Sequence, residues 1–364
     1  MEKPVKFFEC LLPVSICNLR CPYCYIIQEK RREMEYAQLQ YSPQHIGYAL
    51  RKERVGGCCW FSICGAGETM VQKELDDIVF YLLMEGHYVN ITTNGTLTIR
   101  FRQLLKKCEH YASRLHFSFS FHYTELLRLN LLDVFFDNIV YVRNCGASFL
   151  YQMNLCDEYL PYIDEIKRIS YEKLGYFPQV ALTRNENSKP FKIWTHLSNE
   201  DYYHIGHSFD SPLFEFTYKN FNVQRKEFCY AGVWSFILNL QTGSVSQCYA
   251  NTERQNIFEE TDLPIKLKPV GKRCNNSYCI NSSHFISLGV IPEIKAPSYA
   301  DLRCRKGSNW YSAEMYSFLN SKLYESNKEY RVFKKWIINS DHRIYKKIRG
   351  KLSSAKHRIV KKKQ

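Results

Sequence analysis

Short apolar runs alternate with longer segments of helical spacing along the first half of the chain. The short runs have the length and composition of buried strands, and the longer segments repeat apolar residues every three or four positions, as on one face of a helix. Strands are predicted at Phe7–Val14, Cys58–Ile63, Tyr88–Thr93, Leu115–Phe121, Ser148–Leu155 and Gln179–Thr183. Helices are predicted at Ser42–Arg54, Thr69–Glu85, Ile99–Tyr111, Leu126–Val142 and Tyr162–Lys173.

This alternation predicts how the strands pair. A helix between two strands returns the chain to the start of the sheet, so consecutive strands run parallel. We therefore expect an α/β fold in which strand–helix units form a (β/α)6 sheet, curved as a partial TIM barrel. In such sheets the loops at the carboxyl ends of the strands carry the chemistry.

The pattern changes beyond residue 185, where the chain becomes polar and aromatic. Trp234–Leu240 and Ser244–Cys248 predict a hairpin around a Gln-Thr-Gly turn. We predict three regions: the barrel core over residues 1–190, a small cysteine-rich domain over 191–310, and a helical, basic tail over 311–364.

Cysteine is unusually frequent, with 15 residues in a chain of 364. The first residues carry charges and contain no secretory-type apolar segment, and no apolar run approaches the ~18 residues of a membrane span. A disulfide scaffold is therefore not expected. We predict metal or redox use of the thiols in the reducing cytoplasm.

The positive charge is concentrated at the end of the chain. Of the net +14, residues 331–364 contribute 13 Lys and Arg against the single acid Asp341, so the rest of the chain is nearly neutral. The segment predicts a basic amphipathic helix, whose apolar positions are Trp336, Ile337, Ile344, Tyr345, Ile348 and Leu352. It could contact an anionic membrane surface, bind nucleic acid or stay solvated; nucleic acid is the least expected, since basic residues do not extend over the body.

Three cysteines, Cys17, Cys21 and Cys24, lie in one short loop directly after the first predicted strand. Thiolates that converge from one loop suit an iron–sulfur cluster or zinc. A closed zinc site or an ordinary cubane cluster uses four cysteines, so three leave one metal position open. The alternatives are half of a zinc site or three buried thiols.

The spacing C-x3-C-x2-C resembles the signature of the radical S-adenosylmethionine (radical SAM) enzymes, and the resemblance covers roughly residues 5–185. It implies that Cys17, Cys21 and Cys24 hold a [4Fe–4S] cluster, the catalytic metal centre, whose fourth iron is chelated by S-adenosyl-L-methionine. It also implies that an electron from the cluster cleaves the cofactor, and that the resulting 5′-deoxyadenosyl radical abstracts a substrate hydrogen.

Further motifs at predicted strand ends resemble the cofactor-binding segments of that family. Gly65, Gly67 and Glu68 match its GGE motif, which implies that they hold the amino group of S-adenosylmethionine; Thr69 stands where the family usually has proline. Thr93 and Asn94 match a sequence common after the third strand. Plain turns are the alternative in both places.

Polar side chains also recur on the predicted fourth and fifth strands. Ser120 and His122 share one face by the period of two, and Gln152 and Asn154 repeat the pattern, so these residues are candidates for contacts with the ribose or the substrate. For His122 an ordinary core histidine is the alternative. By the resemblance, Tyr23 and Tyr25 lie near the adenine.

A second cysteine set consists of Cys229, Cys248, Cys274 and Cys279. Its spacing C-x13-G-x4-C, followed by a later pair, resembles the start of the SPASM and twitch auxiliary-cluster domains. The resemblance implies a twitch-like site with one additional [4Fe–4S] cluster. A structural zinc site is the alternative. Cys304 is left as a spare thiol, a substitute ligand or a hydrogen-atom donor.

The family resemblance implies an enzyme that dehydrogenates, epimerises or crosslinks its substrate, supplied with electrons by a flavodoxin- or ferredoxin-type donor. Few residues precede the first strand, so we expect a small metabolite or sugar as substrate, with a peptide or protein as the alternative. The rival of another class is a non-catalytic zinc protein whose basic tail binds nucleic acid. We expect a cytoplasmic protein, with peripheral membrane contact through the tail left open.

Overall fold

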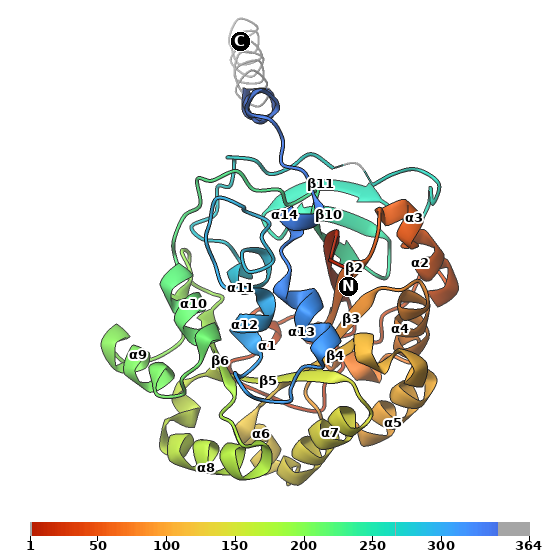
Figure 1. Cartoon of the computed structure of the whole chain (residues 1–364). Coiled ribbons are helices and arrows are strands. Elements are labelled where there is room, and N and C mark those ends of the chain that lie inside the picture. Colours follow the sequence, from red (N-terminus) through yellow and green to blue (C-terminus); the bar gives the residue numbers. More distant parts are fainter. Residues whose placement is uncertain (1, 266, 341–364) are drawn as a thin grey trace, which may run out of the picture.

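The computed structural model describes residues 2–265 and 267–340. Its main feature is a nine-stranded sheet with the order β11-β10-β9-β1-β2-β3-β4-β5-β6. The first six strands pair in parallel, each with the next, and Figure 1 shows helices around the outside of this curved sheet. The predicted α/β barrel architecture is confirmed. The strands are β1 (Lys6–Leu12), β2 (Cys59–Gly65), β3 (Tyr88–Thr93), β4 (Leu115–Ser120), β5 (Ser148–Leu155) and β6 (Gln179–Leu182).

The helices lie at the predicted places, but two of the segments predicted as single helices are divided. Ser42–Arg54 forms α2 and α3, and the helix predicted over Thr69–Glu85 begins only at Leu75, after a short 3-10 turn. The segment predicted as one helix over Leu126–Val142 forms two helices, because Asn130 has a φ of 55° and interrupts the helical backbone. Elsewhere Ser42 caps α2 by accepting from the backbone N–H of His45. The helices of the barrel are α1 (Tyr25–Gln28), α2 (Pro43–Ala49), α3 (Lys52–Val55), α4 (Leu75–Met84), α5 (Thr98–Lys107), α6 (Tyr123–Arg128), α7 (Leu132–Asn144) and α8 (Ile163–Leu174).

The predicted hairpin forms, and it belongs to the barrel sheet. Its first strand, β9 (Ser235–Asn239), runs parallel to β1, and β10 (Ser244–Cys248) and β11 (Asn251–Asn256) extend the sheet further in antiparallel fashion. Phe8 of β1 stacks between Phe61 and Phe236, at ring-centroid distances of 4.9 and 5.1 Å. The hairpin thus covers the edge that β1 would otherwise expose. The division of the chain at residues 190 and 310 stays a prediction.

A short connecting region follows β6. It contains the small β7–β8 pair (Arg184–Asn185 and Lys192–Ile193), α9 (Asn199–His207) and α10 (Pro212–Asn220). After β11 the chain forms four short helices, α11 (Ser282–Phe285), α12 (Tyr299–Arg303), α13 (Ala313–Asn320) and α14 (Leu323–Ser326). None of the helices within the described ranges is long and apolar enough to cross a membrane.

Helices α12 and α13 close the amino-terminal end of the barrel (Figure 1). Phe318 of α13 stacks on Tyr88, the first residue of β3, with ring centroids 3.7 Å apart. Tyr299 of α12 packs against Trp60 near the start of β2. These contacts bury aromatic side chains at the amino-terminal ends of β2 and β3.

The start of the predicted tail is therefore part of the body, since α13 and α14 bury Met315, Phe318 and Leu323. Residues 332–340 form a helix at the edge of the body (Figure 1). Asn339 accepts from the Lys272 amide at 3.2 Å and Ile338 packs against the core, whereas Trp336 is exposed. The remaining apolar positions of the predicted amphipathic helix, Ile344, Tyr345, Ile348 and Leu352, lie outside the described residues.

We expect Phe318→Ala to lower the free energy of unfolding by about 3–5 kcal/mol, because it leaves a cavity where the Phe318 ring packs on Tyr88. Urea denaturation followed by tryptophan fluorescence measures the change. Phe333→Ala is the matched control: Phe333 is 70% exposed, so its removal should change stability by less than about 0.5 kcal/mol. Equal effects of the two substitutions would contradict the packing of α13 on the barrel.

Candidate active site

A cavity of about 820 Å3 lies at the carboxyl ends of the barrel strands. Its size is typical of sites for small ligands and cofactors. It is lined by every residue predicted from the first cysteine motif and the neighbouring strand ends: Cys17, Cys21, Tyr23, Cys24, Tyr25, Gly65, Gly67, Glu68, Thr93, Asn94, Ser120, His122, Gln152 and Asn154. The placement of these residues on one cavity agrees with the prediction, whereas their individual roles stay predictions.

The three cysteines of the first loop lie close enough to influence one another. All fifteen cysteines are free thiols, and burial raises the pKa of Cys21, with further increases from the neighbouring sulfurs of Cys17 and Cys24. Thiols whose deprotonation is this unfavourable are stabilised as thiolates by a bound metal. The donor set therefore fits a three-cysteine iron–sulfur cluster.

No group of three or more His, Cys, Asp or Glu side chains in residues 2–265 and 267–340 is arranged to hold a single metal ion. A [4Fe–4S] cluster makes a different demand, because each cysteine binds its own iron and the sulfurs surround the cluster instead of one point.

Asn94 connects the cysteine loop to the end of β3. Its side-chain nitrogen donates to Asn18 Oδ1 at 2.8 Å and lies 3.8 Å from the sulfur of Cys17. Thr96 completes the connection by donating to Asn94 Oδ1 at 2.7 Å and accepting from Asn18 at 3.0 Å. Since hydrogen bonds to cysteine sulfur adjust the reduction potential of a cluster, Asn94 is placed to act on the predicted metal centre.

The glycine turn after β2 holds the backbone that leads into the cysteine loop. The amides of Gly67 and Glu68 donate to the carbonyl oxygens of Val14 and Ile16 at 2.6 and 2.7 Å. A Cβ atom on Gly67 would lie 2.2 Å from the Ile16 oxygen, so no other residue fits there without moving backbone. The close approach that the glycine permits is thus, first of all, to the protein's own cysteine loop.

Glu68 connects the same turn to β3. Its carboxylate accepts from the Thr93 hydroxyl at 2.6 Å, the Asn94 amide at 2.7 Å and the Met70 amide at 3.0 Å. Burial raises the pKa of Glu68, and these hydrogen bonds act in the opposite direction. Both carboxylate oxygens are therefore engaged by protein donors, and the predicted bond to the amino group of S-adenosylmethionine would be additional to them.

Tyr23 takes part in a hydrogen-bonded network beneath the cysteine loop. Its hydroxyl lies 2.7 Å from His122 Nδ1 and 2.6 Å from the hydroxyl of Tyr159. Burial lowers the pKa of His122 to about 4, so its ring is neutral at pH 7. His122 thus has a structural partner as well as a place on the cavity wall, while Tyr25 is 43% exposed at the rim.

The barrel interior below the cavity contains a polar cluster around Asn90, which sequence reasoning missed. Asn90 donates to Ser62 at 2.9 Å and accepts from Ser118 at 2.9 Å, with His116 Nδ1 2.7 Å away. The only sequence signal for this cluster was the recurrence of polar residues on one face of adjacent strands.

Glu9 is a second residue that sequence reasoning missed. It lies in the middle of the apolar strand β1, is 4% exposed and lines the cavity. Burial raises its pKa to about 7. A charged residue inside an otherwise apolar run was the available signal, because an acid is rarely buried without a role.

The four cysteines of the second set also lie near one another, behind the cavity wall. Burial raises the pKa of Cys229, and the nearby thiol groups of Cys279, Cys248 and Cys274 raise it further. The backbone of Cys229 pairs with Gly271, and Cys248 ends β10. Cys304 is placed elsewhere, with its sulfur 3.6 Å from the hydroxyl of Ser308.

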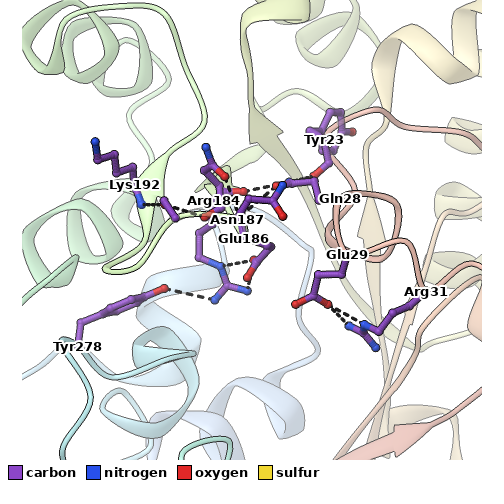
Figure 2. Close-up of polar contacts among 11 residues, drawn as sticks. Tyr23, Gln28, Glu29, Arg31, Arg184, Glu186, Asn187, Lys192 and Tyr278 are labelled. Carbon is purple, nitrogen blue, oxygen red and sulfur yellow. Dashed lines mark hydrogen bonds and ion pairs between the residues drawn. The ribbon is translucent and has the colours of Figure 1, made fainter.

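Arg184 bridges the two cysteine regions (Figure 2). The side chain of Gln28, in the helix directly after Cys24, bonds to the carbonyl of Arg184 and the amide of Glu186, both at 3.0 Å. The guanidinium group of Arg184 reaches the hydroxyl of Tyr278, which lies between Cys274 and Cys279, at 3.5 Å. The β7–β8 pair therefore forms a wall of the cavity that touches both cysteine regions.

A family model described as "Radical SAM superfamily" matches residues 11–145 of this chain. The segment includes the first cysteine loop, the glycine turn and the strands β2 to β4. No curated protein sequence matches the chain.

Solved structures share the fold. Streptococcus suis SuiB bound to S-adenosylmethionine matches with a TM-score of 0.51 and 16% identity over 71% of this chain and 64% of SuiB. SuiB bound to precursor peptide SuiA gives 0.50 and 18% over 72% and 64%. Native anSMEcpe with bound AdoMet and Cp18Cys peptide gives 0.50 and 15% over 93% and 98%. The chain thus spans about 64% of the length of SuiB, and at these identities the likeness concerns the fold alone.

We expect Glu68→Gln to lower the free energy of unfolding by about 1–3 kcal/mol. The substitution replaces one of the two carboxylate oxygens, which accept from three buried donors, by an NH2 group that cannot accept a hydrogen bond. Thermal and urea denaturation test this. Glu172→Gln is the control: its exposed side chain pairs with Arg168 on the surface of α8, and the change should be below about 0.5 kcal/mol. A Glu68→Gln variant as stable as the control would contradict the bridging role of the carboxylate.

Proposed function

Because the chain carries a radical SAM domain over residues 11–145, we propose that it is a radical S-adenosylmethionine enzyme that starts its reaction by removing hydrogen from a substrate C–H bond. When bound, a [4Fe–4S] cluster with S-adenosylmethionine supplies the 5′-deoxyadenosyl radical for this step. The observation that carries the proposal is the single cavity lined by Cys17, Cys21 and Cys24 together with Glu68, Asn94 and the polar strand ends.

In this proposal the chain's own residues hold and shield the reacting groups. The three cysteine sulfurs provide the cluster ligands, and the bonds from Gly67 and Glu68 keep the loop that carries them in place. The polar side chains of Ser120 and Asn154 are available to the ribose or the substrate, since both line the cavity. The plug of α12 and α13 keeps solvent out at the opposite end, as a radical reaction requires.

We further propose that Cys229, Cys248, Cys274 and Cys279 hold an auxiliary [4Fe–4S] cluster. Four mutually close cysteines match the ligand number of a complete cluster, and Tyr278 between two of them lines the cavity. An auxiliary cluster beside the cavity wall could accept an electron from the substrate, which favours an oxidative outcome such as dehydrogenation. Epimerisation and crosslinking are the other proposed reactions. Electrons for the first cluster would come from a flavodoxin- or ferredoxin-type donor.

The proposed substrate is a small metabolite or sugar. A peptide is the second candidate, because SuiB has been solved with its precursor peptide SuiA and anSMEcpe with the Cp18Cys peptide. Peripheral membrane contact through the basic tail is also part of the proposal. It is supported by the exposed apolar side chains of Val332, Phe333 and Trp336 on the helix over residues 332–340.

We expect Cys21→Ala to abolish the formation of 5′-deoxyadenosine, because the cluster loses one of its three ligands. The assay is anaerobic incubation of the reconstituted protein with S-adenosylmethionine and dithionite, followed by chromatography. Cys145→Ala is the control, since Cys145 is a partly exposed free thiol after α7 that does not line the cavity. Continued cleavage by Cys21→Ala would refute the role given to the first loop.

The second cysteine set is tested by metal content. The anaerobically reconstituted wild-type protein should contain about 8 iron and 8 sulfide per chain, and Cys279→Ala about 4 of each, because one cluster loses a ligand. Elemental analysis and Mössbauer spectroscopy measure this. About 4 iron together with one zinc in the wild type would instead identify the second set as a zinc site.

A further inference from the structure

The carboxyl group of Glu9 is only half satisfied by the protein. One oxygen, Oε1, accepts from the side chain of Asn281 at 3.0 Å. The hydroxyl of Tyr249 also interacts with the carboxyl group and lowers its pKa. The other oxygen, Oε2, is buried and has no hydrogen bond of normal geometry; His284 Nδ1 lies 3.6 Å from it and also has no hydrogen bond. A buried carboxyl oxygen without a donor is costly, so this position indicates a missing hydrogen-bond donor.

The surroundings of Glu9 belong to the cavity. Asn281, His284 and Arg303 line it together with Glu9, as do Cys64 of β2 and Tyr249 after β10. Glu9 and Cys64 point to the same side of the sheet, since Glu9 is in register with Ser62, two residues before Cys64. The open carboxyl oxygen is therefore part of the wall of the same cavity that contains the cysteine loop.

The charges around Glu9 restrict the kind of donor that fits. Arg303 is 2% exposed, and its guanidinium group, fixed by two bonds to Ser283 at 2.9 and 3.2 Å, lies near enough to lower the pKa of Glu9. Burial and the charge of Arg303 keep His284 neutral by lowering its pKa. Tyr249, whose hydroxyl is a neutral donor to the carboxyl group, and the Cys64 thiol, whose pKa is raised by burial, are uncharged at pH 7.

A substrate ammonium group would meet the buried positive charge of Arg303, and its desolvation would cost more than that of a neutral group. A carbonyl group offers no donor and could be bound only by the protonated carboxyl, so the compounds below are compared at pH 8.5, above the pKa of about 7 to which burial raises Glu9. A hydroxyl group supplies the missing donor and adds no charge. It can also accept a hydrogen bond from the neutral ring of His284.

We propose that Glu9, with Asn281, His284 and Arg303, forms a substrate subsite that binds a neutral hydroxyl-bearing group through Glu9 Oε2. This inference rests on the proposed function and narrows its substrate class to alcohols such as sugars and other polyols. Glu9 is a binding and positioning residue in this arrangement.

Three ring compounds of the same size test the subsite: cyclohexane-1,2-diol, cyclohexane-1,2-diamine and cyclohexane-1,2-dione. They are titrated by calorimetry and saturation-transfer NMR into the full-length protein reconstituted with iron, sulfide and S-adenosylmethionine, without reductant. The wild type should bind the diol about tenfold or more tightly than the diamine and the dione, because only the diol supplies a neutral donor. This ranking requires no variant, so it does not depend on the folding of one.

Glu9→Gln should reverse the preference. Asn281 keeps the amide oxygen of the new glutamine on its own side, so the amide nitrogen takes the place of Oε2 and a donor replaces the acceptor. Diol binding should weaken about tenfold and the dione should become the preferred compound. Glu172→Gln, exposed on α8, should bind all three compounds as the wild type does. A merely structural role of Glu9 would weaken all three alike.

Several results would overturn the inference: no diol binding by the wild type at tens of millimolar, a preference for the diamine, or an unchanged ranking in Glu9→Gln. A preference for the diamine would identify a cationic substrate instead. Failure of the proposed function is recognised separately, because it would appear as no 5′-deoxyadenosine from the reduced wild-type enzyme whatever the ranking of the three compounds.

Discussion

Two backbone hydrogen bonds hold the cysteine loop against the turn that follows β2, and the arrangement of the site depends on them. They join Gly67 and Glu68 to the segment between β1 and Cys17. Since these amides approach the loop to 2.6 and 2.7 Å, the turn needs a residue without Cβ at Gly67. Glu68 then transmits this fixed position to β3, where Asn94 contacts Asn18 of the loop and lies near the sulfur of Cys17. Hydrogen bonds thus join segments that are far apart in the sequence around the sulfurs of the first cysteine loop.

The two ends of the barrel have different functions for physical reasons. At the amino-terminal end, aromatic side chains of β2 and β3 pack on α12 and α13, which removes apolar surface from water. At the carboxyl end the strands finish in polar residues that line the cavity. The parallel pairing of β9 with β1 brings the hairpin and its cysteine to the same sheet. Cys248 of the second set thus belongs to the same sheet as β1, the strand that leads into the first cysteine loop.

Much of this arrangement was predictable from local patterns. The strands Tyr88–Thr93 and Ser148–Leu155 lie where they were predicted, because short runs dominated by aromatic and branched apolar residues are typical of buried strands even when single polar residues interrupt them. The predicted site residues meet on one cavity because parallel strands present their carboxyl ends at one edge. The pairing of β9 with β1, the plug by α12 and α13, and the partners of Glu68 were not predictable. They are contacts between distant segments, and periodicity carries information only about neighbours along the chain. The break at Asn130 was missed because a single left-handed residue leaves the apolar spacing intact.

The polarity of the cavity differs between its two sides, and this difference has a consequence for chemistry. On the side of the first cysteine loop, the buried acid Glu68 has three protein donors and needs no ligand to satisfy it. On the side of β1, the buried acid Glu9 is contacted by Asn281 and Tyr249, and its Oε2 has no hydrogen bond. Folding alone would favour an apolar residue at that position of β1, because a half-satisfied carboxyl group destabilises the barrel. A buried acid with an open oxygen in a cavity is typical of a group whose missing partner is supplied by a ligand. Glu68 therefore serves to fix the first cysteine loop. In the proposed enzyme, the open oxygen of Glu9 is available to bind the substrate.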